Sequence, residues 1–403
     1  MSPLETDIPA LLLKKNQDKR LRSGHCWIFS NEIDSEKTPI KALQPGEQVA
    51  VLDEKELFIG FGYVNPQSLI AVRLLSRDQS HPISESLLVH RLNIALSLRQ
   101  RLYAEPYYRA VYGEADGLPG LVVDRYGDYL VAQLGTAGME ALRQPLLNAL
   151  DKVFKPRGVL LRNDSAAREL EGLPRQVELA AGEIPEQVEL SEGGCRFRVS
   201  LHEGQKTGWF FDQAANRDRL MPLLRERRVL DLFSYVGGWG VRAAQAGASA
   251  VTCVDSSESA LTQLLENAQL NGVEQRVDSL RGDAFEILRQ LKESKQRFDV
   301  VLVDPPAFIK RRKDQKQGEL AYRRINQAAM QLLSRDGLLI SSSCSHHLSG
   351  ERLLGLINQA GRHLDRSLQL LISGAQGPDH PIHPAIPETA YLKNFSLRVL
   401  PRF

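Results

Sequence analysis

From about residue 203 onward, short apolar runs alternate with amphipathic stretches in a regular order of strand and helix. The runs predict strands at 229–233, 250–254, about 277–281, 299–303, 338–342, 368–372 and about 392–400, with helices between most of them. This alternation is typical of a doubly wound α/β domain with a mainly parallel sheet. Ligands of such sheets bind at the carboxyl ends of the strands, so candidate chemistry is expected there.

In the preceding 200 residues the apolar runs are short and turn signals separate them. Apolar runs at 27–29, 48–52, 57–63 and 69–74, separated by turn signals, predict a small β-barrel in residues 1–75. Between 76 and 200 the pattern predicts a small α+β domain: a helix over 84–103 capped by Ser84, a hairpin around Gly127-Asp128, a helix over 140–153, a strand at 158–162 and a last hairpin at 187–201. The predicted domains are therefore 1–75, 76–200 and 201–403.

Composition narrows the class of protein. The chain has 403 residues, 25% charged and 42% hydrophobic, as in ordinary globular proteins of several domains. The net charge is only +2, so binding to nucleic acid requires local patches. The four cysteines are far apart and form no CxxC pair, and His346-His347 has no third ligand in sight, so no metal site is expected. Without a signal peptide or an apolar run near 20 residues, we expect a cytoplasmic protein with no membrane partner.

A basic segment opens the first predicted domain. Residues 14–22 contain five basic side chains against Asp18, and His25 and Trp27 follow; the basic residues are Lys14, Lys15, Lys19, Arg20 and Arg22. Basic side chains beside an aromatic ring suit an RNA backbone and a stacked base. The alternative is a solvated charged face.

The first three strands of the α/β domain all end in an acid: Asp231, Asp255 and Asp283. A formal GxGxxG/A pattern follows the first strand at 238–243, but its first glycine lies too far from Phe233 for a dinucleotide turn. Asp231 would also face a pyrophosphate. S-adenosylmethionine carries a positive sulfonium and ammonium instead, so these acids favour it as the cofactor. The alternative is that each acid only caps a helix.

The fourth strand ends in Asp304-Pro305-Pro306-Ala307-Phe308. Two prolines hold the chain extended and leave carbonyls free to face a planar substrate, while Phe308 is placed to stack on its ring. Asp304 would reach the reactive end of the cofactor. The basic loop that follows predicts contacts to an RNA backbone, or else a solvated loop; its residues include Lys310, Arg311 and Arg312.

Cys344 follows the fifth strand and is a candidate nucleophile. Carbon 5 of a pyrimidine is a weak nucleophile, but a thiolate that adds to carbon 6 produces an enamine able to attack a methyl group. Asp304 would assist the proton movement. The alternative for a single cysteine is a small buried hydrophobic residue, which is how we interpret Cys26, Cys195 and Cys253.

Several segments together resemble one family. They are Arg22–Phe29, Gly113–Leu121, Lys206–Gln213, Asp231–Tyr235, the Asp-Pro-Pro tip, Ser343–Ser345, Asp379–Pro381 and Tyr391–Lys393. They resemble the ribosomal RNA large subunit methyltransferase I family, which makes 5-methylcytosine in large-subunit (23S) ribosomal RNA. The resemblance implies an N-terminal PUA domain, a Rossmann-like class I methyltransferase domain and a ribosomal RNA partner, with a homodimer as an open possibility. It also implies cofactor contacts from Gln213, Asp231, Phe233, Ser234, Tyr235, Gly237, Asp255, Asp283, Asp304 and Pro305.

The chain departs from the family pattern at three points. Cys26 and Trp239 replace residues that are common there, and we expect neither to touch the chemistry. The Asp-Pro-Pro tip also lacks the second cysteine that helps many RNA cytosine methyltransferases to release product, so another base is needed. Two alternatives stay open: an N-methyltransferase that needs no thiol, and a non-enzymatic RNA-binding protein of ribosome assembly.

Overall fold

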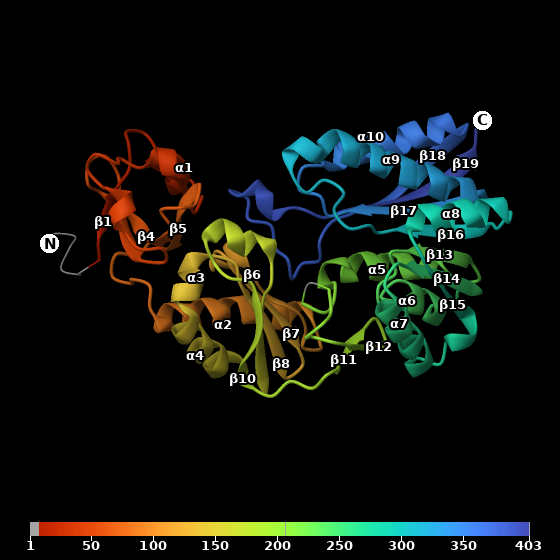
Figure 1. Cartoon of the computed structure of the whole chain (residues 1–403), viewed down its shortest axis with the longest axis horizontal. Coiled ribbons are helices and arrows are strands. Elements are labelled where there is room, and N and C mark those ends of the chain that lie inside the picture. The colour runs from red at the N-terminus through yellow and green to blue at the C-terminus, as the bar shows by residue number, and fades with distance from the viewer. Residues whose placement is uncertain (1–7, 206, 403) are drawn as a thin grey trace. The chain divides into compact units, whose positions relative to one another are not determined.

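The computed structural model describes residues 8–205 and 207–402, which divide into two compact units. Unit 1 comprises Met1–Val188, Ser200–Trp209 and Asp379–Thr389, and unit 2 comprises Glu189–Val199, Phe210–Pro378 and Ala390–Phe403. Figure 1 shows the elements of both units and labels many of them. Among the described residues, none of the helices combines the length and the apolarity needed to span a bilayer.

The first part of unit 1 is a five-stranded sheet, as the apolar runs predict. Its strands lie in the order β1 (Ala10–Leu12), β3 (Gln48–Leu52), β4 (Phe58–Val64), β5 (Ile70–Ser76) and β2 (Trp27–Phe29). Strand β1 and helix α1 (Asp18–Arg22) were not predicted, because both are too short to show a period. The basic segment therefore carries a helical turn.

The second part of unit 1 is a mixed sheet packed against helices. Ser84 caps α2 (Glu85–Leu102) as predicted, since its hydroxyl accepts from Leu87 N. The predicted hairpin is formed by β7 (Leu121–Tyr126) and β8 (Tyr129–Leu134). The sequence missed both outer strands, and the remaining elements are β6 (Tyr107–Tyr112), β9 (Gly158–Asn163), β10 (Gln176–Gly182), α3 (Ala137–Ala141) and α4 (Arg143–Phe154).

Unit 2 is the predicted doubly wound α/β domain. Its strands lie in the order β15 (Val277–Arg281), β14 (Ala250–Asp255), β13 (Arg228–Leu232), β16 (Phe298–Val303), β17 (Leu333–Ser343), β19 (Lys393–Pro401) and β18 (Arg366–Gly374). The first five are parallel, and β19 is antiparallel to both of its neighbours. The chain order reverses between β13 and β16, which is where such sheets bind ligands.

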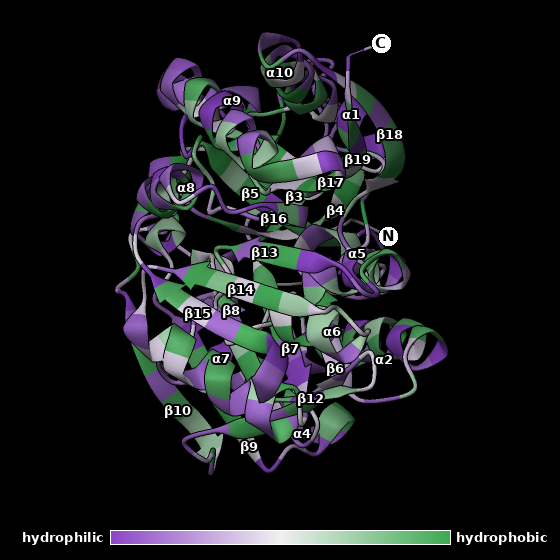
Figure 2. Cartoon of the chain, turned by 90° about the vertical axis from the view of Figure 1, so that its right-hand side faces the viewer, coloured by the Kyte–Doolittle hydropathy of each residue, from purple (hydrophilic) through white to green (hydrophobic). Residues whose placement is uncertain are grey.

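Helices cover both faces of this sheet (Figure 1). One face carries α8 (Ala284–Glu293), α9 (Gln315–Leu332) and α10 (Gly350–His363), and the other carries α6 (Gly240–Gln245) and α7 (Glu258–Leu270). Figure 2 shows the inner strands mostly in the hydrophobic colour, and α9 and α10 in both colours. Because both faces are covered, the strands are continuous apolar runs, and Leu230, Val301 and Leu339 are fully buried in one core.

The hairpin of β11 (Val188–Glu192) and β12 (Cys195–Val199) differs from its sequence assignment. We assigned it to the middle domain, but Glu189–Val199 belongs to unit 2. The side chains of Asn267 and Asn271 on α7 accept from Arg198 N and Arg196 N at 2.8 and 2.9 Å. These contacts satisfy the free edge of β12, which no periodicity in the sequence reveals. The predicted domain boundaries at 75 and 200 otherwise stay a prediction.

Candidate active site

The loop after β13 has an unusual backbone. Phe233 and Tyr235 have φ angles of 64° and 49°, and Gly237 has a φ of 94°. Left-handed conformations are costly for side chains other than glycine and persist only where the surroundings enforce them. Here Ser234 N donates to Val254 O (3.0 Å) and Tyr235 N donates to the carboxylate of Asp255 (2.9 Å). The end of β14 therefore shapes the loop at the end of β13.

Asp231 lies beneath this loop and is fully buried. Burial raises its pKa well above 3.8, the charge of Asp304 acts in the same direction, and a hydrogen bond from the backbone of Gly240 acts against both. A cation bound nearby would stabilise the carboxylate form of both acids. The structure therefore places at the end of β13 a buried carboxyl group whose ionisation depends on a nearby cation.

The acids at the next two strand ends also bond to the backbone. Asp255 accepts from Ser257 N at 2.9 Å in addition to Tyr235 N, so it orders both the loop and the start of α7. Asp283 is exposed and caps α8 by accepting from Phe285 N and Glu286 N at 2.9 and 3.2 Å. Asp283 therefore caps a helix, as the alternative interpretation predicted. Both of these bonds go to Oδ1, so Oδ2 is left for a ligand.

Asp304 is held by two neutral donors. Gln213 Nε2 lies 3.0 Å from both carboxylate oxygens, and Trp239 Nε1 donates to Oδ2 at 3.0 Å. Our expectation that Trp239 stays away from the chemistry is therefore wrong. Sequence position placed this side chain in a glycine turn, and only the packing of the turn aims its indole at the end of β16.

The support of Gln213 comes from residues that the sequence analysis missed. Gln213 also donates to Ser342 Oγ (3.3 Å), which accepts from Asn394 Nδ2 (2.9 Å), and its own Oε1 accepts from Asn216 Nδ2 (2.7 Å). All four side chains are buried. One signal was available: three successive serines at 341–343 inside a buried strand are unusual and indicate a polar network.

Phe308 and Pro305 lie at the tip of β16. Pro305 is buried and Phe308 is half-buried, with its ring 4.8 Å from that of Tyr322 and 6.4 Å from that of Phe233. The Tyr322 hydroxyl in turn bonds to the hydroxyls of Ser343 and Ser345, both at 2.9 Å. An aromatic cluster therefore joins the tip of β16 to the end of β17.

Cys344 directly follows β17 and is half-buried, whereas the other three cysteines are buried. Burial raises the pKa of Cys26 to about 12 and that of Cys195 to about 11, and it also raises the pKa of Cys253. Thiols of this kind are poor nucleophiles at neutral pH. Cys344 is thus the accessible thiol among the four, as its predicted role requires.

Lys393 is a further side chain that the sequence analysis did not assign to the site. It opens β19, opposite Ser343 in the sheet register. Its Nζ donates to Ser345 O and to Tyr391 O, each at 2.7 Å. No motif spacing reveals it, because the antiparallel pairing of β19 with β17 brings it beside Cys344 from 49 positions away in the chain (393 − 344).

The predicted RNA-binding residues of the first domain are largely engaged within unit 1. Arg20 forms two 2.8 Å bonds with Glu32, and Arg22 pairs with Asp18 and Asp53 at 2.7 Å. His25 is buried, and burial followed by the charge of Arg20 lowers its pKa. Arg22 is exposed despite these pairs, and so are Lys14, Lys15 and Lys19, of which Lys14 donates to Asn31 O.

The basic loop after Phe308 lies on unit 2. Lys310, Arg311 and Arg312 are exposed, and Arg311 pairs with Asp314 at 3.1 Å. The structure therefore leaves these cations available to a polyanion. No group of three or more His, Cys, Asp or Glu side chains in the described parts of the chain gathers as a metal site.

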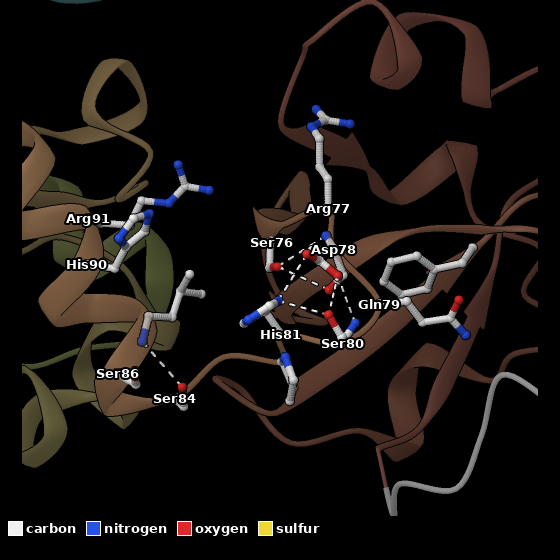
Figure 3. Close-up of a pocket in the computed structure, with 13 residues that line it drawn as sticks. Ser76, Arg77, Asp78, Gln79, Ser80, His81, Ser84, Ser86, His90 and Arg91 are labelled. Atoms are coloured by element: carbon white, nitrogen blue, oxygen red, sulfur yellow. Dashed lines mark hydrogen bonds and ion pairs between the residues drawn. The ribbon is translucent and has the colours of Figure 1, made fainter.

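Unit 1 also contains an open depression of about 1050 Å³ that the sequence did not predict (Figure 3). It lies between the end of β5 and the first turns of α2 and is lined by serines together with Arg77, His81, His90 and Arg91. Arginine and serine side chains commonly contact phosphate groups, but the carboxylate of Asp78 also lines the depression and pairs with His81 at 2.9 Å. They escaped the sequence analysis because they do not form a run.

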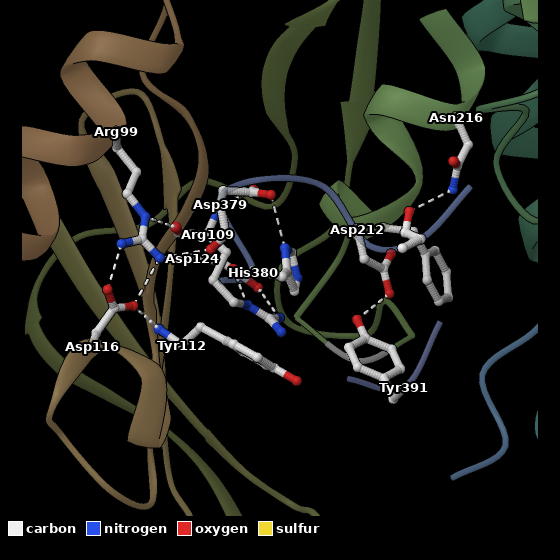
Figure 4. A network of polar contacts seen from close by, with 12 residues as sticks. Arg99, Arg109, Tyr112, Asp116, Asp124, Asp212, Asn216, Asp379, His380 and Tyr391 are labelled. Carbon is white, nitrogen blue, oxygen red and sulfur yellow. Dashed lines mark hydrogen bonds and ion pairs between the residues drawn. The ribbon is translucent and has the colours of Figure 1, made fainter. Parts of the chain in front are cut away.

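The segment Asp379–Thr389 is part of unit 1. Arg99 is fully buried, bonds to Asp116 at 2.6 and 2.8 Å, and donates to Asp379 O at 2.6 Å; Asp379 accepts from Arg109 N and pairs with His380 (Figure 4). Within unit 2, Figure 4 also shows the bond from Tyr391 to Asp212. The Asp379-His380-Pro381 segment therefore has a structural role.

Comparison with known proteins places the chain. The profile of the PUA-like domain family matches residues 11–77, and that of the S-adenosylmethionine-dependent methyltransferase family matches residues 171–386. The chain is 36% identical over 394 residues to ribosomal RNA large subunit methyltransferase I of Tolumonas auensis, covering 96% of this chain and 98% of that protein. This protein belongs to the ribosomal RNA large subunit methyltransferase I family.

Other members of the family agree with this assignment. The chain is 35% identical over 396 residues to the Aliivibrio fischeri enzyme of the same name, with 97% of this chain and 99% of that protein covered. A methyltransferase solved in complex with SAH aligns with a TM-score of 0.83 at 21% identity, covering 97% of this chain and 100% of the other. That structural likeness confirms the class I methyltransferase fold.

The cofactor of this protein is S-adenosylmethionine. The residues present fit it, because carboxylates converge on the loop after β13 from three strand ends and Ser234 Oγ, among the described residues, is buried without a hydrogen-bond partner. Asp231 and Asp304 suit its positive groups, and Asp255 suits its ribose hydroxyls. When bound, it supplies an electrophilic methyl group on a sulfonium sulfur.

Proposed function

We propose that this protein forms 5-methylcytosine in large-subunit (23S) ribosomal RNA, with Cys344 as the nucleophile. The name shared by its relatives supports the RNA substrate. The observation that carries the chemistry is the position of Cys344, which is the accessible thiol of the chain and follows β17, next to the strand that ends in Asp304.

The proposed reaction balances with the groups at hand. The Cys344 thiolate forms a bond to carbon 6 of cytosine, and the electrons of the carbon 5–carbon 6 double bond move so that carbon 5 becomes nucleophilic. Carbon 5 then takes the methyl group from the sulfonium sulfur, and the electron pair of the broken methyl–sulfur bond stays on that sulfur, which leaves as a neutral thioether. The proton on carbon 5 then leaves to a base. Its electron pair restores the double bond as the carbon–sulfur bond breaks, which regenerates the thiolate.

We assign the proton-accepting role to Asp304, directly or through one water. The tip of β16 has no second cysteine, and Asp304 is the titratable side chain at its base. The two donors from Gln213 and Trp239 hold its carboxylate in one orientation. Phe308 supplies a ring beside the site for stacking on the target base.

Replacement of Cys344 by alanine tests the nucleophile. The Cys344→Ala protein is expected to bind S-adenosylmethionine with unchanged affinity in calorimetry and to transfer no methyl group to ribosomal RNA. The control is Ser349→Ala, a change at an exposed helix cap a few residues along. Full transfer by Cys344→Ala would overturn the thiolate mechanism.

The alternatives give different outcomes in the same assay. Transfer without Cys344, with the label on a ring or exocyclic nitrogen, would establish an N-methyltransferase. Failure of the intact protein to bind S-adenosylmethionine would point to a non-enzymatic assembly protein. Mapping of modified bases in ribosomal RNA from cells with and without the gene identifies the target nucleotide.

We further infer that the basic loop on unit 2 binds the RNA backbone. Changing Lys310, Arg311 and Arg312 together to glutamine removes three exposed cations and is expected to lower the slope of log affinity against log salt by about 2 to 3. The control changes Arg289 and Lys292, two exposed cations on α8, to glutamine. An unchanged salt slope for the triple variant would place the RNA contact elsewhere.

Two further inferences accompany this function. A ribosomal RNA substrate fits the predicted cytoplasmic location. A homodimer stays a prediction, which the mass of the purified protein in solution, measured by light scattering, would decide.

A further inference from the structure

We propose that Lys393 is a positioning residue whose ammonium group holds Cys344 as a thiolate. The proposal rests on the proposed function only for the reaction that the thiolate performs. The ionisation of Cys344 is a property of the resting protein and is measurable whether or not Cys344 is the nucleophile.

The geometry places the ammonium at the backbone next to the thiol. Lys393 pairs with Ser343 across the antiparallel β17–β19 ladder, and its Nζ lies 2.7 Å from the carbonyl oxygen of Ser345. The same ammonium group donates a second hydrogen bond of 2.7 Å, to Tyr391 O. Cys344 lies in the chain between Ser343, the last residue of β17, which pairs with Lys393, and Ser345, whose carbonyl oxygen accepts from Lys393 Nζ.

The electrostatics agree with this placement. Burial lowers the pKa of Lys393 to about 8, and the charge of Cys344 acts against that effect. Interaction between two sites is mutual, so the ammonium favours the thiolate as much as the thiolate favours the ammonium. Both hydrogen bonds of Lys393 go to carbonyl groups, and within the described residues no carboxylate pairs with it, so its charge is left for Cys344.

Other titratable groups also face Cys344. Tyr322 reaches it from α9, and the charge of Cys344 contributes to the raised pKa of that phenol after burial, which is the larger cause. His346 lies in the same loop, with its ring 5.7 Å from that of Tyr391. Asp304 stands at the end of the neighbouring strand. Lys393 differs from these groups because two hydrogen bonds to backbone carbonyl groups fix its ammonium group.

The ionisation involves no other reactant. The thiol proton of Cys344 leaves to water, and Lys393 stays protonated on either side of the step. The thiolate and the ammonium are then two half-buried opposite charges, and the low local dielectric strengthens their attraction.

Alkylation of the thiol as a function of pH tests the proposal. The rate of iodoacetamide reaction at Cys344, with the Cys344→Ser rate subtracted, reports the thiolate fraction. In Lys393→Met the midpoint is expected to rise by about 1 pH unit, which is about tenfold less thiolate at neutral pH. Lys393→Arg keeps the charge and is expected to restore most of the reactivity. The matched control is Lys292→Met, at an exposed lysine on α8.

A midpoint of alkylation in Lys393→Met equal to that of the unchanged protein would overturn the proposal. Lys393 would then have only a structural role, through its hydrogen bonds to Ser345 O and Tyr391 O. A lower thermal stability with the same midpoint would lead to that conclusion as well.

A reciprocal measurement covers the case in which Lys393→Met does not fold. Lysine titration by NMR in the otherwise unchanged protein and in Cys344→Ser is expected to show a lower pKa for Lys393 once the thiolate is absent. Equal values would exclude the coupling. Loss of methyl transfer in Cys344→Ala tests the proposed function separately, since neither the alkylation nor the NMR result depends on turnover.

Discussion

At the scale of single residues, neutral hydrogen-bond donors orient the carboxylates of the site. Asp304 receives the amide of Gln213 and the indole of Trp239, and Asp255 receives two backbone N–H groups. These donors orient the carboxylates, and Arg217, whose charge acts on Asp304 and Asp231, is itself paired with Glu192. A pocket of this kind selects a cation, which explains why S-adenosylmethionine suits it better than a dinucleotide phosphate.

Substitution of Asp255 tests whether the strand-end carboxylates bind the cofactor. Asp255→Ala removes the acceptor for Tyr235 N and the predicted partner of the ribose, so the affinity for S-adenosylmethionine is expected to fall about 10- to 100-fold by calorimetry. Asp278→Ala, at an exposed acid on the neighbouring strand β15, serves as control and is expected to bind normally. Equal affinities for the two variants would remove Asp255 from the cofactor site.

At the scale of elements, the approach of α6 to the sheet decides the shape of the cofactor loop. Gly240 opens α6, and a Cβ there would lie 2.4 Å from Cys253 Sγ and 3.1 Å from Asp231 Oδ2. The helix therefore packs on β13 and β14 at a distance that only glycine allows. The loop of residues 233–237 is held between this helix and the ends of the two strands.

Alanine at this position tests the close approach. Gly240→Ala is expected to lower the free energy of unfolding by about 1–3 kcal/mol, because either the helix or Cys253 must move. Gly355→Ala on α10 is the matched control, since no atom lies within 4 Å of its Cβ, and it is expected to stabilise by roughly 0.5–1 kcal/mol through helix propensity. Urea denaturation measures both. A Gly240→Ala protein as stable as the control would show that α6 has room to spare.

At the scale of the whole molecule, the chain does not complete one unit before beginning the next. Unit 1 takes in Ser200–Trp209 and Asp379–Thr389, and unit 2 takes in Glu189–Val199. Ile386, from the late segment, lies in the same core as Leu11 and Val51. Folding of unit 1 therefore depends on residues that follow most of unit 2 in the chain.

The buried pair of Asp379 and His380 allows the contribution of the late segment to the stability of unit 1 to be measured. Burial opposes the ionisation of Asp379, but the charge of His380 and the bond from Arg109 N outweigh it and lower its pKa. Asp379→Ala is expected to cost about 3–5 kcal/mol, because His380 and Arg109 N lose a buried partner. Asp336→Asn breaks an exposed pair with Arg398 and is expected to cost less than about 1 kcal/mol.

The same pair gives a pH dependence with a definite sign. Because the pKa of Asp379 is lowered on folding, its stabilisation is complete above the unfolded value near 3.8 and is lost as the pH falls through the folded value. The difference in unfolding free energy between the unchanged protein and Asp379→Ala should therefore shrink in acid. A constant difference down to the acid transition would contradict the charged pair.

The sequence by itself determined the elements and the class of chemistry. Strands buried on both faces are continuous apolar runs, so the α/β unit and its strand ends were readable, and with them Asp231, Asp255, Asp304 and Cys344. Caps such as Ser84 were readable because they act within four residues. Short or outer elements, such as β1, β6 and β10, were not, since their burial comes from distant neighbours.

Only the tertiary structure decided which side chains meet. Trp239 donates to Asp304, Lys393 donates to Ser345 just after β17, and Asp379 accepts from Arg109 N, across separations from 48 to 270 positions. It also decided that Arg20 and Arg22 pair internally with Glu32 and Asp53 instead of remaining a free basic face. Local sequence reports the preference of a residue for helix, strand or turn. The partner of a polar side chain depends on strand order and helix packing, which no short stretch of chain contains.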